Sequence, residues 1–248
     1  MSMVTRRLIK IPSKYAEELG NDFIISKEKK VIASLGQYFT PQIIAELIAK
    51  NFSEVKPANE LKILDSGAGS GILSCTLCEQ ITNWQHKPKH IELTAYEIDN
   101  ALVPLLKKSF SSLKHWLADK SISLSFSIND KDFVLENADI LDKTFQRSLF
   151  SEKNFEEFDF IVANPPYFKI PKSDPRAKAA STVIHGQPNI YALFMALAGA
   201  LLKKRVSLVL SPRVAMRLVF TSNVREAAGI HGLARGGMSP REAGKRSL

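Results

Sequence analysis

The chain has little cysteine, no long apolar run, and no lysine of the phosphate-gripping kind after its glycine-rich segment. Two cysteines in 248 residues do not make a disulfide framework, so a reducing, cytoplasmic setting is expected. No run of 18 apolar residues occurs, and residues 1–10 have no apolar signal-peptide core, so we expect neither a membrane partner nor a secretory leader. Hydrophobic residues make up 45% of the chain, which is enough for one large domain.

The two cysteines, Cys75 and Cys78, have the C-x-x-C spacing of some zinc and redox sites. A second cysteine pair, which a zinc site would need, is absent from the sequence. Both residues fall within an apolar helix expected at residues 72–81, where buried structural cysteine is common. We therefore expect them to pack in the core and to bind no metal.

Positive charge is in excess, with 34 lysines and arginines against 25 acids and a net charge of +9. A basic surplus favours a polyanionic partner such as nucleic acid, although many basic proteins bind none specifically. The irregular stretch 169–189 contributes to this surplus, and its basic side chains could contact phosphates or simply be solvated: Lys169, Lys172, Arg176 and Lys178.

A strand, a glycine-rich turn and a helix follow one another at residues 61–65, 66–71 and 72–81. This order is the nucleotide-binding start of a doubly wound α/β sheet. The turn has the spacing G-x-G-x-G without a following Lys-Ser/Thr, so it is not a P-loop. Asp65 ends the strand, and the glycines would let a ligand approach the backbone closely.

Further acids follow later strands of the predicted sheet. The strand 91–97 ends at Glu97, whose distance from the glycine turn suits a carboxylate that holds two ribose hydroxyls. Ile98 could then lie on an adenine face, and Asp99 would cap a helix at 100–119. Helix capping is also the alternative to the ribose-binding role of Glu97. Residues 121–128 alternate as a half-buried strand, and residues 137–140 are expected to form a short strand and turn.

The most unusual segment is Asn164-Pro165-Pro166-Tyr167, which follows a buried strand at 158–163. Each proline has a fixed φ and no N–H, so the turn is stiff and its carbonyls can accept hydrogen bonds. The Asn164 side chain adds a carbonyl acceptor, and Tyr167 adds a flat aromatic face. The segment therefore suits a planar amino group and the ring that carries it, although Asn and Pro are also common in ordinary turns.

The remaining pattern predicts five more segments. A short helix is expected at 12–19. A second runs from about 40 to 51, with Thr40 as N-cap and Ile43, Ile44, Leu47 and Ile48 on its apolar face. Residues 141–156 should form a loop or short helix over the site entrance. An apolar helix follows at 189–202, and the last strand lies at 206–210.

In this order the motifs resemble those of the adenine-specific (N-6) DNA methyltransferases, gamma subgroup, of the restriction-modification type. The resemblance rests on residues 36–41, 65–71, 96–99, 137–140 and 164–167, with Asn189-Ile190-Tyr191 and Phe194 after the catalytic strand, and it covers roughly residues 30–213. It implies a Rossmann-like doubly wound α/β sheet of the S-adenosylmethionine-dependent methyltransferase type, incomplete at the C-terminus.

The resemblance also implies S-adenosylmethionine as cofactor and double-stranded DNA, with the target base flipped out, as substrate. Phe39 and Thr40 would contact the methionine part of the cofactor, and Asp65, Gly67 and Gly69 would line that pocket. Glu97 would hold the ribose hydroxyls and Ile98 would cover the adenine, while Asp139, with Ile140 beside it, would accept from the adenine amino group. The catalytic residues would be Asn164, Pro165, Pro166 and Tyr167.

The likeness to the family ends near Val214, where the usual Ser-Phe pair after Pro-Arg is missing. We divide the chain into an N-terminal extension (1–30), a catalytic domain (31–213) and an atypical, disordered tail (214–248). Two hypotheses account for the tail: a truncation or frameshift, or a specificity or nuclease partner that supplies recognition. Rival functions are an RNA or protein-glutamine methyltransferase, or an inactive cofactor- or DNA-binding remnant.

Overall fold

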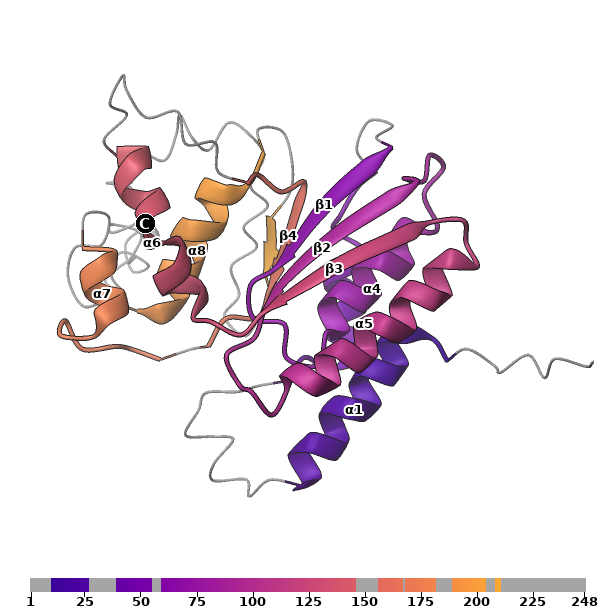
Figure 1. Cartoon of the computed structure of the whole chain (residues 1–248), viewed down its shortest axis with the longest axis horizontal. Coiled ribbons are helices and arrows are strands. Elements are labelled where there is room, and N and C mark those ends of the chain that lie inside the picture. Colours follow the sequence, from indigo (N-terminus) through magenta and orange to yellow (C-terminus); the bar gives the residue numbers. More distant parts are fainter. Residues whose placement is uncertain are drawn as a thin grey trace, which may run out of the picture.

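The structure, a computed structural model, describes residues 10–26, 39–54, 59–145, 156–166, 168–181, 189–203 and 208–210. Within these ranges the strands form one parallel five-stranded sheet in the order β3-β2-β1-β4-β5 (Figure 1). The strands are β1 (Glu60–Asp65), β2 (His90–Tyr96), β3 (Ser123–Asn129), β4 (Phe160–Ala163) and β5 (Leu208–Leu210). The helices are α1 (Pro12–Ser26), α3 (Gln42–Ala49), α4 (Ile72–Ile81), α5 (Val103–Ala118), α6 (Phe133–Phe145), α7 (Pro175–Ala179) and α8 (Ile190–Leu201).

The strand order reverses at β1. The chain moves outward from β1 through β2 to β3 and then returns to place β4 on the other side of β1. Such a reversal is the topological switch point of a doubly wound sheet, where ligands bind beyond the carboxyl ends of the strands. The predicted fold class is thus confirmed, and the switch point lies between the glycine turn and the Asn-Pro-Pro turn.

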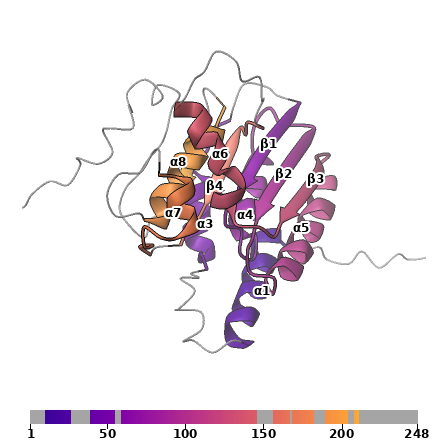
Figure 2. The same cartoon turned by 60° about the vertical axis from the view of Figure 1, so that its left-hand side comes forward.

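Successive side chains of the central strands point to opposite faces of the sheet, so the protein has two hydrophobic cores, one on each face. On β1, Ile63 belongs to the first cluster and Leu64 to the second; on β4, Val162 belongs to the first and Ile161 to the second. Helices α1, α3, α4 and α5 supply the first cluster, and α6, α7 and α8 supply the second. Figures 1 and 2 show these two groups of helices on opposite sides of the sheet.

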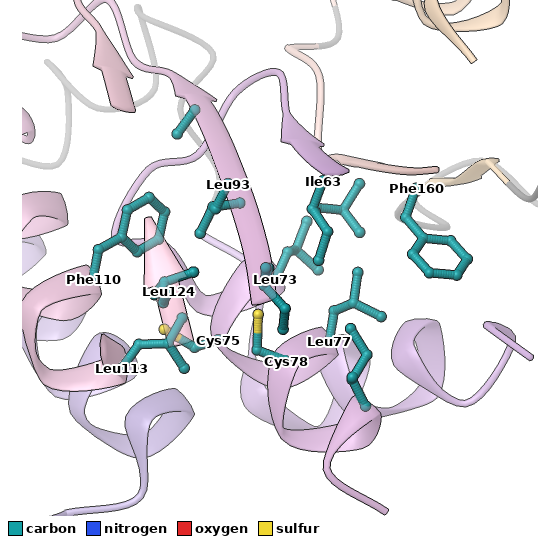
Figure 3. Packing of buried hydrophobic residues seen from close by; sticks show 14 of the residues in the cluster. Ile63, Leu73, Cys75, Leu77, Cys78, Leu93, Phe110, Leu113, Leu124 and Phe160 are labelled. Carbon is teal, nitrogen blue, oxygen red and sulfur yellow. The ribbon is translucent and has the colours of Figure 1, made fainter. Parts of the chain in front are cut away.

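Cys75 and Cys78 lie on the buried side of α4, packed among the apolar residues of the first cluster (Figure 3). Both are free thiols without exposed surface, and burial raises the pKa of each. Within the described ranges, no three His, Cys, Asp or Glu side chains gather as a metal site would require. The prediction that these cysteines pack in the core is confirmed.

The first helix is longer than predicted and docks on the domain. Ser13 donates from its backbone N–H and its hydroxyl to the two carboxylate oxygens of Glu79 on α4, at 2.7 and 2.9 Å. Ala16 has no exposed surface and belongs to the first core cluster. The described part of the predicted N-terminal extension therefore packs as part of the same core, and the other domain boundaries stay predictions.

The prediction of a strand and turn at residues 137–140 is wrong, because these residues lie inside α6. Asp132 starts the helix by accepting from the N–H groups of Val134 and Leu135 at 2.8 and 3.1 Å. Phe133 and Val134 are adjacent and both buried, Leu135 and Glu136 are exposed, and Ala138 is buried again, which is helical rather than alternating strand periodicity. A capped helix with a buried stripe thus replaces the expected strand.

Two predicted caps are also wrong. Pro41, in an extended conformation, is the N-cap of α3 and no side chain caps that helix, so Thr40 is not its cap. Helix α5 begins at Val103 after Leu102, while Asp99 accepts from the Ala101 N–H in the preceding turn.

Two further segments differ in detail. Ile43 and Leu47, expected on the buried face of α3, are 68% and 53% exposed. The stretch 169–189, expected to be irregular, contains α7. No helix among the described residues is long and apolar enough to cross a membrane.

Candidate active site

The carboxyl ends of β1, β2 and β4 meet at one edge of the sheet, and backbone hydrogen bonds tie the segments that follow them. The N–H of Ser66, just after β1, donates to the Val162 carbonyl on β4 at 3.3 Å. The N–H of Ala68 donates to the Tyr96 carbonyl at the end of β2 at 2.9 Å. The glycine turn is therefore fixed to both neighbouring strands.

The glycines leave room on the surface of this turn. A Cβ at Gly67 would lie 3.9 Å from the Phe194 ring and 4.0 Å from the backbone carbonyl oxygen of Asn164, so Gly67 faces the Asn-Pro-Pro turn. Gly69 has a φ of +57°, and a Cβ there would lie 3.8 Å from the Phe39 ring. A side chain at Gly69 would fill space toward Phe39, which the family resemblance assigns to the same cofactor pocket, and a side chain at Gly67 would fill space toward the Asn-Pro-Pro turn.

Asp65 is fully buried at the end of β1. The Ser74 hydroxyl donates to its Oδ2 at 2.6 Å, whereas Oδ1 has no hydrogen-bond partner within the described ranges. Burial raises the pKa of Asp65 to about 7, although the Ser74 hydroxyl and the Gly67 N–H act in the opposite direction. An incompletely satisfied buried carboxylate beside a glycine turn suits a cationic group of a ligand.

Glu97 lies just beyond β2 and is 8% exposed. Its Oε2 accepts from the Gly69 N–H and its Oε1 from the Asp99 N–H, each at 2.8 Å. Burial raises the pKa of Glu97 against these two hydrogen bonds. A carboxylate has about four acceptor positions, so these bonds hold Glu97 in place and leave capacity for hydroxyl donors. Ile98, the next residue, is 60% exposed at the same edge.

The Asn-Pro-Pro turn follows β4, with Pro165 buried and Asn164 and Pro166 half-buried. The Asn164 Nδ2 donates to the hydroxyl oxygen of Thr40 at 3.1 Å. The structure thus brings the predicted Thr40 of the cofactor site to the predicted catalytic asparagine. Tyr167 lies outside the described residues, so its predicted role as a stacking platform stays a prediction.

Asp139 and Ile140 do not lie at a strand end. Asp139 is exposed on α6, and Ile140 is buried in the second core cluster. The acids that follow β3 are Asp130 and Asp132, with Phe133 next along the chain, and the sequence alone did not single out any of the three. Phe133 packs against Tyr96 and Phe194 with ring centroids 5.1 Å apart in both cases. An acid after a strand was the signal that could have found this position, because Asp65 ends β1 and Glu97 follows β2 in the same way.

Among the basic side chains of 169–178, Arg176 is already engaged. Its guanidinium donates to both carboxylate oxygens of Asp174 at 2.9 and 2.7 Å, and it lies over the Phe168 ring. These carboxylate contacts raise the pKa of Arg176. Lys169, Lys172 and Lys178 are exposed and are the better candidates for phosphate contacts.

A parallel sheet in this order, with a glycine turn, two buried acids and an Asn-Pro-Pro turn at its switch point, defines an α/β Rossmann-like chain of the methyltransferase class. The family comparison makes this more specific. The chain belongs to the Eco57I restriction-modification methylase family, whose model matches residues 75–227. The match extends past residue 213, and the assignment of 214–248 to a disordered tail stays a prediction.

Individual relatives agree with the family. The Type II methyltransferase M.BsuBI of Bacillus subtilis is 31% identical over 66% of this chain and 31% of its own length. The Type II methyltransferase M.PstI of Providencia stuartii is 29% identical over 73% of this chain and 34% of its own length. A release factor glutamine methyltransferase of Lactococcus lactis is 25% identical over 68% of this chain and 47% of its own length. The chain thus spans about a third of the length of the two Type II enzymes.

S-adenosylmethionine is the cofactor of this class of methyltransferase, and the residues at the sheet edge fit it. The Oδ1 of Asp65, which has no hydrogen-bond partner among the described residues, suits a cationic group, and the glycine turn leaves open backbone beside it. Glu97 offers carboxylate oxygens for hydroxyls, and the exposed Ile98 offers an apolar surface.

Proposed function

We propose that this chain is the catalytic part of a DNA methyltransferase that transfers a methyl group from S-adenosylmethionine to the exocyclic amino group of adenine. The observation that carries the proposal is the position of the Asn-Pro-Pro turn. It ends β4 directly beside the glycine turn that follows β1, with the Asn164 backbone carbonyl oxygen 4.0 Å from where a Gly67 Cβ would lie. The residue whose side chain would accept from the amine therefore adjoins the glycine turn.

The chemistry requires orientation more than acid–base strength. The lone pair of an exocyclic amine is delocalised into the ring, so this nitrogen is a poor nucleophile. The Asn164 side-chain carbonyl and the Pro165 backbone carbonyl would accept the two amine hydrogens and favour a pyramidal nitrogen, with its lone pair turned toward the cofactor. When bound, S-adenosylmethionine supplies a methyl group on a positively charged sulfur. Positioning and electrostatics at the turn would then provide most of the catalysis.

An adenine amine inside a duplex is out of reach, so the substrate would be double-stranded DNA with the target base flipped out. Unstacking costs a few kcal/mol, and stacking on an aromatic face such as Tyr167 would return about 1–3 kcal/mol. In this proposal Lys169, Lys172 and Lys178, which are exposed after the turn, would contact phosphates near the flipped base. A specificity or nuclease partner, as in other restriction-modification systems, is part of this proposal.

A second function has one specific observation in its favour. The relative from Lactococcus lactis is a release factor glutamine methyltransferase, and a glutamine amide is also a planar nitrogen. The Asn-Pro-Pro turn suits either substrate, as it would suit an RNA base amine. Two relatives named as Type II methyltransferases and the restriction-modification family model favour DNA.

The test is labelled methyl transfer from S-adenosylmethionine, with unmethylated DNA, total RNA and a protein extract offered in parallel. We expect the label in DNA, recovered as N-6-methyladenine. Label in RNA or in protein would overturn the choice of substrate. Cofactor binding with no label in any of the three would show a remnant that binds without transferring.

The role of the turn is tested with Asn164→Ala in the same assay. We expect transfer to be lost while cofactor binding survives, because Asn164 contributes to the amine site and not to the buried acids. A matched control is Asn137→Ala, which removes another half-buried asparagine whose Nδ2 donates to the Phe133 carbonyl at 2.8 Å. Near-normal turnover by Asn164→Ala would refute the assigned role.

A further inference from the structure

One hydrogen bond joins the two halves of the candidate site across 124 positions of sequence. The Asn164 Nδ2, just after β4, donates to the Thr40 hydroxyl oxygen at 3.1 Å. Thr40 precedes α3 and is 7% exposed. Because Pro41 is the N-cap of α3 and no side chain caps that helix, helix capping does not explain the threonine hydroxyl.

The orientation of the Asn164 amide decides what it can bind. One end of a side-chain amide is a carbonyl that only accepts, and the other is an NH₂ that only donates. An amine whose hydrogens must be bound needs the carbonyl end. With the amide rotated by half a turn, NH₂ would face N–H and the interaction would be lost. The Thr40 hydroxyl can donate as well as accept, but in the structure it accepts from the Asn164 Nδ2, so this bond holds the amide in the productive orientation, with its carbonyl end turned away from Thr40.

Thr40 is held firmly enough to serve as this acceptor. The Glu17 carboxylate on α1 accepts from the N–H of Gln42, two residues after Thr40, at 2.9 Å. Phe39, the residue before it, packs on Phe23 of α1 with ring centroids 6.0 Å apart. A Cβ at Gly20 would lie only 3.0 Å from the Phe39 ring, so α1 approaches this segment closely. The segment that carries Thr40 is thus fixed on both sides by α1.

We infer that Thr40 is a positioning residue for methyl transfer, whose hydroxyl oxygen holds the Asn164 NH₂ and so turns the Asn164 carbonyl toward the target amine. The inference rests on the proposed function and deepens it. It assigns Thr40 a task at the amine, beyond the contact with the methionine part of the cofactor that the family resemblance implies. It also gives α1 a task, because α1 sets the position of Thr40.

The test compares Thr40→Val, which keeps the shape and loses the acceptor, with Thr40→Ser, which keeps the hydroxyl. For Thr40→Val we expect kcat at saturating cofactor to fall by about tenfold to a hundredfold, the effect of losing one well-placed hydrogen bond in a transition state. The cofactor Kd should change much less than kcat, the melting temperature should stay near that of the wild type, and Thr40→Ser should restore most of the rate.

Thr82→Val is the matched control. It removes the hydroxyl of another buried threonine, which donates to the Glu79 carbonyl at 2.7 Å at the far end of α4. We expect no change in its kcat. A Thr40→Val enzyme with a weakened cofactor Kd and a normal saturated kcat would overturn the inference, as would equal losses in the Val and Ser variants or no loss in either.

A second readout separates this inference from the proposed function. The side-chain ¹⁵N–¹H₂ signals of Asn164, assigned by their absence in Asn164→Ala, report on its NH₂ hydrogen bond without any turnover. We expect them to shift in Thr40→Val and to stay in place in Thr40→Ser and Thr82→Val. If the wild-type chain transfers no label, the proposed function fails, and the NMR signals alone then test the bond between Thr40 and Asn164. Unchanged Asn164 signals in Thr40→Val would overturn the positioning role of Thr40.

Discussion

The glycine-turn half and the Asn-Pro-Pro half of the sheet edge prepare for their ligands by different physical means. The first uses buried charge and backbone: Asp65 and Glu97 have 0% and 8% exposure, and Gly69 donates to Glu97. The second uses neutral groups, namely a half-buried amide whose Nδ2 donates to Thr40, and a proline carbonyl. The comparison teaches that charge is placed where a cationic cofactor fits, whereas neutral acceptors are placed where a neutral amine must react.

A consequence of this difference is that only the glycine-turn half should respond to pH near neutrality. Burial raises the pKa of Asp65 to about 7 and also raises the pKa of Glu97. The Asn-Pro-Pro turn offers an amide and backbone carbonyls, which do not titrate in this range.

Gly71→Ala should damage the glycine-turn half most severely. Gly71 has a φ of +87°, and a Cβ there would lie 2.8 Å from the Phe110 ring and 2.9 Å from Leu106 Cδ1. Backbone strain and overpacking together should lower the free energy of unfolding by about 2–4 kcal/mol. Urea unfolding measures this loss. An unchanged midpoint would mean that α4 and α5 do not pack against the turn as described.

Asp65→Asn should stabilise the ligand-free protein by an amount that depends on pH. The folded-state pKa of about 7 lies above the ordinary 3.8, so the folded state favours the protonated acid. Stability from this group is complete below about pH 4 and is lost as the pH rises through 7. The neutral side chain of the Asp65→Asn variant does not titrate, so it loses no stability over this pH range. The melting-temperature difference, variant minus wild type, should therefore grow between pH 4 and pH 7, and a constant difference would contradict the raised pKa.

Cofactor binding should release a proton near neutral pH. A cationic ligand favours the ionised form of Asp65, so affinity should rise as the pH increases to about 7 and then level off. Calorimetric titration at pH 6.5 in two buffers of different ionisation enthalpy measures the released proton. The Asp65→Asn variant serves as the control and should bind more weakly without proton release. Equal proton release by this variant would assign the titration to another group.

Gly20→Ala should have the smallest effect. The new Cβ would lie 3.0 Å from the Phe39 ring and 3.2 Å from the Ser70 hydroxyl, while the helix gains up to about 1 kcal/mol in propensity. We expect little change in stability and a cofactor affinity several-fold weaker, because Phe39 borders Gly69. Fluorescence or calorimetric titration checks this. Unchanged affinity would show that the position of Phe39 does not matter to the cofactor.

Much of this edge could be predicted from the sequence, because strands, glycines and prolines carry local signals. The helix 72–81 agrees with α4 in both bounds, and the predicted strand 61–65 falls within β1. The error at Asp139 arose because an acid before an isoleucine was taken for a strand end, while the capped helix after Asp132 was overlooked. The bond between Thr40 and Asn164 could not be predicted, because it joins segments 124 positions apart that only the folded sheet brings together.

The docking of α1 was equally hidden, since it depends on contacts across the fold rather than on periodicity. Ser13 reaches Glu79 and Glu17 reaches Gln42, and neither pair has a local pattern that indicates it. Helical periodicity predicted a short helix, whereas tertiary packing extends it to Ser26. These long-range contacts are also the ones that set the position of Phe39 and Thr40.

The most direct test of the account measures cofactor Kd and single-turnover transfer rate on the same preparations of Asp65→Asn and Asn164→Ala. The account predicts opposite defects: Asp65→Asn binds the cofactor more weakly but transfers once it is saturated, whereas Asn164→Ala binds normally and does not transfer. If Asn164→Ala lost cofactor affinity together with transfer, or if saturation failed to restore transfer to Asp65→Asn, the division of the sheet edge into two halves would be contradicted.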